Sequence, residues 1–216
     1  MTATPTTTSP AAPSIRLLPP SAAAGSAAAV TKIINAAFGG VEADDIFNVP
    51  DKKRTTESEV ARYILASEFL VAYDAPNTGA TAAADEDSKE KDEEKPKESK
   101  AEEVIVGCVR VSRIDARTAG LGMLAVGDAV RGTGVGRLLV AAAEQWARDR
   151  LGCDIMQIEL LRPSTWKHTR KEMLAAWYLR LAYVLLRVAR PDEFVPGLEA
   201  FLATPCDFEI YQKVLA

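Results

Sequence analysis

The fold of this chain is decided by the stretch Met123-Leu124-Ala125-Val126-Gly127-Asp128-Ala129-Val130-Arg131-Gly132-Thr133-Gly134-Val135-Gly136-Arg137-Leu138-Leu139. Its apolar start predicts a strand, and its end opens a helix whose apolar residues recur at helical spacing. Three alternating glycines lie between the two, where a backbone without side chains can approach a ligand closely. The first N–H groups of a helix lack internal partners and carry partial positive charge, so we expect this turn to bind a pyrophosphate, with Arg131 and Arg137 adding charge.

The glycine-rich turn has three other interpretations. One is a turn that only joins strand to helix. A dinucleotide fold requires Gly-x-Gly-x-x-Gly, whereas here the spacing is Gly132-x-Gly134-x-Gly136, and Arg137 stands where the third glycine would be needed. A Walker loop requires Gly-Lys-Ser or Gly-Lys-Thr, which the sequence does not contain. The pyrophosphate turn is therefore the favoured interpretation, in a setting other than these two folds.

Short apolar segments on both sides of this stretch predict strands alternating with helices. We expect strands at 14–18, 69–73, 104–111, 121–126, 155–161, 184–188 and 208–213. We expect helices at 27–38, after a cap at Thr55 or Thr56, at 135–151 and at 170–182, with a short one near 196–202. The early strands follow one another as hairpins and the later ones alternate with helices. This order predicts a mixed α/β (α+β) sheet with helices on both faces.

Two segments have compositions that cannot form a core. Residues 1–13 are Thr, Ala, Pro and Ser with few larger side chains and predict a disordered tail. The second segment, at about 75–102, begins with small residues and continues as a Lys/Glu/Asp run, so it predicts a solvated, disordered insertion. Strand-like segments flank it on both sides. We therefore expect one domain, 14–216, with the insertion inside it.

Composition excludes several classes of protein. The net charge of −4 arises in the charged insertion, and the rest of the chain is close to neutral, which does not indicate nucleic-acid binding. No apolar run reaches the roughly 18 residues that a membrane helix needs. Three widely spaced cysteines and a single histidine predict neither a disulfide scaffold nor a zinc site, and no metal is expected. The N-terminus has no secretory signal, so we expect the cytoplasm or, alternatively, the nucleus.

Two motifs resemble the GNAT superfamily of acetyl-CoA-dependent N-acyltransferases. Arg131-x-x-Gly134-x-Gly136 is similar to that family's Arg/Gln-x-x-Gly-x-Gly/Ala signature, and Ala175–Tyr183 resembles its fourth-helix motif. The C-terminal half looks like a group of fungal GNAT proteins. The resemblance implies a GNAT fold, a twisted, mostly antiparallel sheet of six or seven strands with splayed central strands. It also implies direct transfer of an acetyl group from acetyl-CoA to a primary amine in a ternary complex.

The chain departs from the family pattern at three places. Lys171 stands where the family often has Asn, Ala182 replaces a Gly, and the strand at 121–126 contains no carboxylate. These departures keep a second interpretation open, a non-catalytic acyl-CoA-binding or sensing module. A third is a protein-binding adaptor whose charged insertion is the active part. The acceptor is open between a small-molecule amine and a protein or peptide amine, and the oligomeric state is not indicated.

The resemblance also assigns site residues. It implies that acetyl-CoA contacts the strand, the turn and the fourth helix at Leu124, Ala125, Val126, Arg131, Gly132, Thr133, Gly134, Val135, Gly136, Arg137 and Lys171. Tyr178 corresponds to the usual general acid for the departing thiolate. A phenol with a pKa near 10 can donate a proton at neutral pH. The alternative is a tyrosine of the apolar core.

Candidates for the general base, which takes a proton from the attacking amine, are chosen by their position in the sequence. Glu159 lies in the middle of a predicted strand, where a lone carboxylate is costly to bury, and it is the first candidate. Its alternative is a charge at the sheet edge or a buried ion pair. Glu42, Asp44 and Asp45 could instead serve as the base or select a cationic amine. His168 is a further candidate because histidine titrates near neutral pH, and its alternative is a surface histidine beside Lys167.

Overall fold

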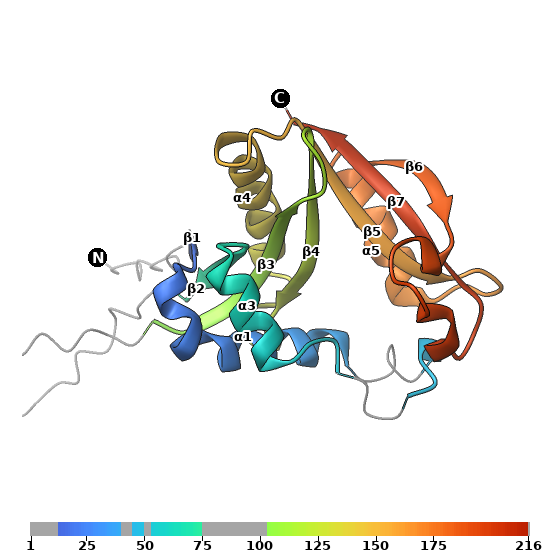
Figure 1. Cartoon of the computed structure of the whole chain (residues 1–216), viewed down its shortest axis with the longest axis horizontal. Coiled ribbons are helices and arrows are strands. Elements are labelled where there is room, and N and C mark those ends of the chain that lie inside the picture. The colour runs from blue at the N-terminus through green and yellow to red at the C-terminus, as the bar shows by residue number, and fades with distance from the viewer. Residues whose placement is uncertain (1–12, 40–44, 50–52, 75–102, 216) are drawn as a thin grey trace, which may run out of the picture.

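The computed structural model describes residues 13–39, 45–49, 53–74 and 103–215 (Figure 1). The expected tail up to residue 12, the charged insertion, Glu42 and Asp44 lie outside the described residues. Within the described segments, every helix is too short or too polar to cross a membrane.

Seven strands form one sheet in the order β1-β2-β3-β4-β5-β7-β6. Neighbours pair antiparallel except β4 and β5, which pair in parallel, so the expected mixed and mostly antiparallel sheet is confirmed. The strands are β1 (Ser14–Leu17), β2 (Phe69–Tyr73), β3 (Ile105–Arg113), β4 (Thr118–Val126), β5 (Ile155–Pro163), β6 (Val184–Ala189) and β7 (Cys206–Val214).

Helices cover both faces of the sheet, as predicted (Figure 1). The helices α1 (Ala23–Phe38) and α3 (Glu57–Leu65) build one core with β2, β3 and the end of β4. The helices α4 (Val135–Asp149) and α5 (Thr169–Arg180) build a second core against the other face. Thr56 caps α3, and its hydroxyl accepts a hydrogen bond from the backbone N–H of Glu59 at 3.2 Å, which the sequence predicted.

Two boundaries differ from the sequence predictions. The helix expected from residue 27 begins at Ala23, because Pro20 and the alanines that follow it start a helical turn earlier. The strand expected from residue 121 begins at Thr118, since Thr118–Leu121 pair with Ile155–Ile158 of β5. Small residues such as Ala119 and Gly120 resemble a turn locally, and pairing with a distant strand overrides that preference.

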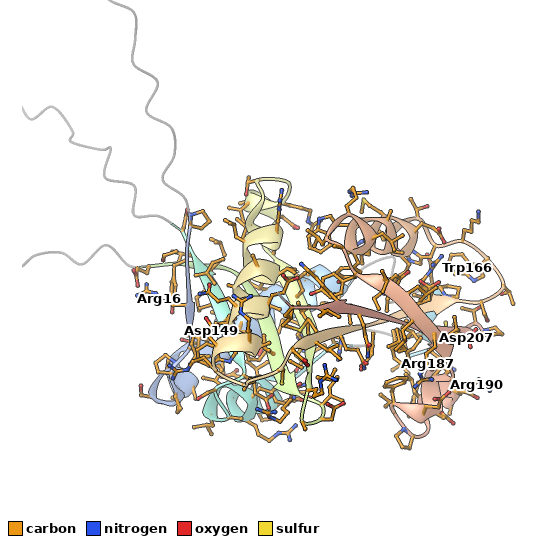
Figure 2. The ribbon with its side chains drawn as sticks, turned by 90° about the horizontal axis from the view of Figure 1, so that it is seen from above. Arg16, Asp149, Trp166, Arg187, Arg190 and Asp207 are labelled. Carbon is orange, nitrogen blue, oxygen red and sulfur yellow. The ribbon has the colours of Figure 1, made fainter. Side chains whose placement is uncertain are left out.

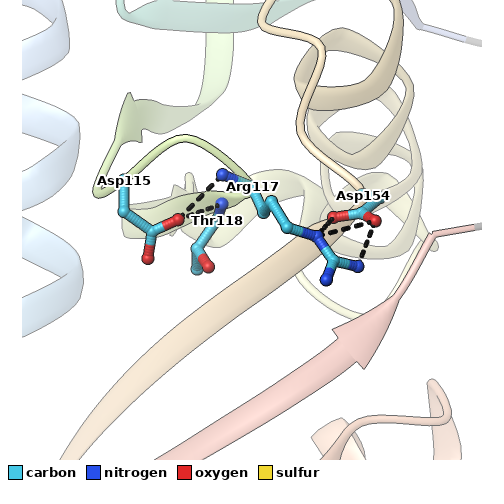
Figure 3. A network of polar contacts seen from close by, with 4 residues as sticks. All are labelled: Asp115, Arg117, Thr118 and Asp154. Carbon is cyan, nitrogen blue, oxygen red and sulfur yellow. Dashed lines mark hydrogen bonds and ion pairs between the residues drawn. The ribbon is translucent and has the colours of Figure 1, made fainter.

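A polar network ties the start of β4 to the start of β5 (Figure 3). One carboxylate oxygen of Asp115 accepts hydrogen bonds from the backbone N–H groups of Arg117 and Thr118, both at 2.8 Å. The guanidinium of Arg117 binds Asp154, with Nε 3.0 Å from Oδ1. The backbone N–H of Ile155 also donates to the carbonyl of Arg117 at 3.0 Å. The two central strands are therefore held together at this end.

This network predicts an acid-dependent loss of stability. The backbone hydrogen bonds from Arg117 and Thr118 lower the pKa of Asp115 below 3.8, and the contact with Arg117 lowers that of Asp154. A depressed folded-state pKa adds stability above the unfolded value and loses it as pH falls through the folded value. We expect Asp115→Asn to flatten the fall in unfolding free energy below about pH 4 in urea titrations. Asp149→Asn is the control, because that exposed carboxylate contacts its exposed neighbour Arg148 and accepts no backbone hydrogen bond in the described chain; an equal flattening there would contradict the prediction.

Candidate active site

The central strands β4 and β5 diverge after a short shared ladder. They pair only over Thr118–Leu121 and Ile155–Ile158, and no described strand pairs with Gly122–Val126 on its β5 side (Figure 1). The splayed central strands that the family resemblance implied are therefore present. The diverging strands β4 and β5 enclose a wedge-shaped gap, which we call the wedge. The Asp115–Asp154 network holds the strands together at its closed end, and the other end, beyond Leu121 and Ile158, is open.

A β-bulge in β4 lies where the strands begin to part. Cys108 of β3 pairs with Ala125 and Arg110 pairs with Gly122, so two residues of β4 face one residue of β3. Met123 in the bulge has a φ of 48°, a left-handed conformation that is uncommon for a residue with a side chain. Bulges bend a strand and increase its twist. This bulge thus helps to turn the end of β4 away from β5, a feature that no sequence pattern indicated.

The bulge also exchanges the faces of β4. Leu121 belongs to the core beneath α4, whereas Met123 and Ala125 belong to the core beneath α1. A slip of one residue moves every following side chain to the opposite face. Leu124 and Val126 therefore face α4 and α5 and are half-buried there, on the side of the sheet where the glycine-rich turn lies.

The glycine-rich turn opens α4 in a conformation that requires glycine. Gly132 and Gly134 have φ values of 83° and 95°, and Gly134 is the residue that precedes the helix. Apart from the two chain neighbours, no atom of the described residues lies within 4 Å of where a β-carbon would stand at either position. In the described chain, the N–H groups of Val135, Gly136 and Arg137 donate to no backbone carbonyl. Open space, three outward donors and the positive end of α4 together fit a pyrophosphate.

Basic side chains flank this turn on the surface. Arg131 is exposed and forms an ion pair with Asp128 at 2.5 Å, and Arg137 is exposed as well. Exposed pairs of this kind contribute little stability, so Arg131 can exchange its partner for a phosphate at small cost. The hydroxyl of Thr133 donates to the carbonyl of Val130 at 2.7 Å and fixes the turn.

The turn, the end of β4 and α5 meet at one point. A β-carbon built on Gly136 would lie 3.6 Å from Cγ2 of Val126 and 3.9 Å from the ring of Trp177. The next residue, Tyr178, is 6% exposed and packs with Trp177, Tyr183 and Tyr211, whose ring centroids lie 5.2, 6.1 and 6.2 Å from its own. The structure therefore brings Trp177 next to the predicted cosubstrate turn and places Tyr178, the next residue, in the aromatic core.

Glu159 is the first residue of β5 beyond its pairing with β4. Its carboxylate is exposed and accepts a hydrogen bond from Nε2 of Gln157 at 2.8 Å. Beyond Ile158, β5 pairs only with β7 among the described strands, so Glu159 lies on the free edge that β5 presents to the wedge. Its exposed carboxylate is not in a buried ion pair, and the alternative of a charge at the sheet edge stays open. It faces the side of the sheet opposite α5, because Leu160, the next residue, packs in the core beneath α4 and α5.

The remaining candidates divide into buried and exposed groups. Lys171 and His168 are each 7% exposed, so the expectation of a surface histidine is wrong. The ring of His168 stacks with that of Trp166. This contact depends on the conformation of the loop before α5, so the sequence alone did not predict it. Asp45 is exposed. The thiols of Cys108, Cys153 and Cys206 are all buried and unpaired by disulfides.

Two connecting segments that lie far apart in the sequence contact each other. Phe47, after α1, forms an isolated β-bridge with Leu202, between β6 and β7. The N–H of Ala203 donates to the carbonyl of Ile46 at 2.8 Å, and the N–H of Asn48 donates to that of Phe201 at 3.0 Å. These contacts join segments more than 150 residues apart, and no local pattern indicated them.

Comparison with known proteins finds a family whose model matches the part of the chain that carries these features. Residues 62–166 match the model of the acetyltransferase (GNAT) family, a segment that spans the wedge, the glycine-rich turn and Glu159. A search of curated proteins found no match.

Solved structures share the fold at low sequence identity. Ard1 from Thermoplasma volcanium is 13% identical with a TM-score of 0.58, covering 95% of this chain and 99% of that one. The Salmonella typhimurium protein yncA, solved with its cofactor acetyl-CoA, is 17% identical with a TM-score of 0.56, covering 95% of both chains. Rv2747 from Mycobacterium tuberculosis, solved with CoA, is 16% identical with a TM-score of 0.56, covering 94% and 100%.

Proposed function

The chain is a member of the GNAT acetyltransferase family, and on that premise we propose that it transfers an acetyl group from acetyl-CoA to a primary amine by direct attack in a ternary complex. The observation that carries the proposal is the open wedge between β4 and β5, with the glycine-rich start of α4 at its mouth. Acetyl-CoA is the cosubstrate, and two of the similar structures were solved with acetyl-CoA or CoA.

Residues of the turn and of β4 would hold the cosubstrate. The N–H groups of Val135, Gly136 and Arg137 bind the pyrophosphate, and Arg131 leaves Asp128 to add a second charge. Leu124 and Val126 line the path of the pantetheine arm, because the bulge turns them toward α4 and α5. Backbone N–H groups on the unpaired edge of β4 near Val126 polarise the thioester carbonyl. Lys171 stays a proposed contact on the fourth-helix motif.

Two side chains would move protons on opposite sides of the wedge. The acceptor nitrogen bonds to the acetyl carbon and the carbon–sulfur bond breaks. Glu159, directly or through a water molecule, takes the proton that the attacking amine loses, and Tyr178 donates its phenolic proton to the departing thiolate. Holding amine and thioester together contributes much of the acceleration.

Replacing Glu159 tests the proposed base. Glu159→Gln keeps a polar side chain beside Gln157 and removes only the basic oxygen. We expect turnover to fall about 10²-fold, the lower end of the range for one acid–base group, with acetyl-CoA affinity unchanged. Initial rates across pH, alongside calorimetric binding of acetyl-CoA, measure both. Wild-type turnover in a folded variant would remove Glu159 from the mechanism.

The acceptor class is decided by product analysis. CoA release with a panel of amines, followed by mass spectrometry of acetylated products from a cell extract, separates small-molecule from peptide acceptors. Binding of acetyl-CoA with no release of CoA for any of the amines tested would instead favour the sensing module.

We propose that residues 14–216 act as one domain in this reaction and that the insertion at 75–102 is dispensable for it. Retained turnover after its deletion supports that division and counts against the adaptor.

A further inference from the structure

The N-terminal end of α5 holds a buried histidine that the proposed acetyl transfer does not use. His168 is 7% exposed, and neither of its ring nitrogens has a hydrogen-bond partner among the described residues. An imidazole always carries at least one N–H donor, and buried polar groups in proteins are almost always paired. The ring is therefore prepared for a partner that the chain itself does not supply.

Trp166 covers one face of this ring and separates it from solvent. The two rings stack with centroids 5.5 Å apart and an angle of 27° between their planes. Trp166 is 40% exposed, and its indole N–H donates to the hydroxyl of Thr204 at 3.2 Å. Thr204 lines a cavity of about 510 Å³, and Trp166 lines a neighbouring one of about 480 Å³. Figure 2 shows Trp166 and Asp207 together at this end of the molecule.

The charge around the ring favours an anion. His168 is the residue before α5, so its ring lies at the positive end of a helix of 12 residues. Lys171, one turn further along the same helix, is also 7% exposed. Burial raises the pKa of the neighbouring Cys206 thiol to about 11, and Lys171 is close enough to oppose that rise.

The acidic side chains near this end are directed elsewhere. Glu172 and Glu209 both bind the guanidinium of Arg162, the latter at 2.5 Å. Asp207 is half-buried and lines both cavities, so it faces solvent. Among these described carboxylates, none takes the role of hydrogen-bond acceptor for His168.

We propose that His168 and the N-terminal end of α5 form a subsite for a carboxylate group carried by the acceptor. Trp177 lies beside the glycine-rich turn, and His168 precedes it by nine residues, or about 13 Å along the helix axis. The subsite is therefore separate from the proposed pyrophosphate site. Arg170 ties it to the acceptor side, since its guanidinium donates to the carbonyl of Ala37 at the end of α1 at 3.1 Å. The link to an acceptor rests on the proposed function, whereas the anion site does not.

The single histidine of the chain makes the subsite directly observable. The only imidazole signals in an NMR spectrum belong to His168, and we expect acetate to shift them saturably while acetamide, its neutral analogue, leaves them unchanged. Equal shifts with both probes, or none with acetate, would overturn the subsite. A shift caused by CoA alone that abolishes the acetate response would assign the site to a CoA phosphate and overturn the acceptor proposal.

Acceptor pairs test the link to catalysis. A dipeptide and its C-terminal amide differ only in the carboxylate, and we expect the wild type to have the lower KM for the dipeptide. His168→Phe keeps a ring beneath Trp166, removes both nitrogens and should raise the KM for the dipeptide about tenfold or more relative to the amide. Lys167→Ala, an exposed cation beside it, should keep the wild-type ratio.

The outcomes separate the two proposals. A wild type that prefers the amide or acetylates neither peptide overturns the acceptor assignment, as does an unchanged KM ratio in His168→Phe. A wild type that does not bind acetyl-CoA defeats the proposed function, and the acetate titration then still decides the anion subsite.

Discussion

Gly134→Val is expected to abolish acetyl-CoA binding. Gly134 has a φ of 95° and, apart from its chain neighbours, no described atom within 4 Å of its β-carbon position, so the added side chain occupies the space assigned to the pyrophosphate. A branched residue also resists a positive φ, which disturbs the direction of the first N–H groups of α4. We expect an affinity loss of more than about 10²-fold, since several charge-assisted hydrogen bonds are lost together. Isothermal titration calorimetry with acetyl-CoA measures it.

A matched variant separates this effect from backbone strain. Gly152, beyond the other end of α4, also has a positive φ, 62°, and, apart from its chain neighbours, no described atom within 4 Å of its β-carbon position. Gly152→Val should lower the melting temperature to a similar extent and keep acetyl-CoA affinity. If Gly134→Val is folded and binds acetyl-CoA like the wild type, the turn is not the cosubstrate site.

Tyr178→Phe is expected to lower turnover by about 10²–10⁴-fold, the range for one acid–base group. The substitution keeps the ring that packs with Trp177, Tyr183 and Tyr211 and removes only the proton donor. Acetyl-CoA affinity should change little, because the proposed contacts lie in the turn and β4. Steady-state rates with a responsive amine, alongside a melting curve, measure the two effects.

Tyr183→Phe is the control within the same aromatic cluster. The hydroxyl of Tyr183 donates to the carboxylate of Glu144 at 2.9 Å, and Nζ of Lys213 binds that carboxylate at 2.8 Å. Removing this hydroxyl should lower stability by about 1 kcal/mol, a typical hydrogen bond, without affecting turnover. If Tyr178→Phe instead keeps wild-type turnover with a lowered melting temperature, Tyr178 is a core residue and water protonates the thiolate.

Local patterns predicted the elements and the turn because their causes are local. Helical spacing of apolar residues, the cap at Thr56 and the glycines of the turn act within a few residues of one another. The order of hairpins and helices then predicted the sheet, and two motifs predicted the family. The roles of Tyr178 and Glu159 are still predictions, since position alone does not establish proton transfer.

Features that depend on distant contacts were not predictable in this way. The bulge at Met123 arises from pairing with β3, and the one local sign of it, Gly122 in the strand, does not specify a bulge by itself. His168 is buried because Trp166 folds over it and reaches Thr204, 38 residues further on. The bridge between Phe47 and Leu202 joins two connections with no shared periodicity. Each is set by packing between elements, which a single sequence does not reveal.

The bulge at Met123 has a consequence for the chain while it is being synthesised. β1 to β4 emerge before β5, and β4 pairs with β3 while its other edge awaits a parallel partner that begins 29 residues after Val126. An uncovered strand edge invites pairing with another nascent chain, and bulges are one means by which proteins prevent it. The distortion that keeps the wedge open in the finished protein thus also shields β4 from aggregation on the ribosome.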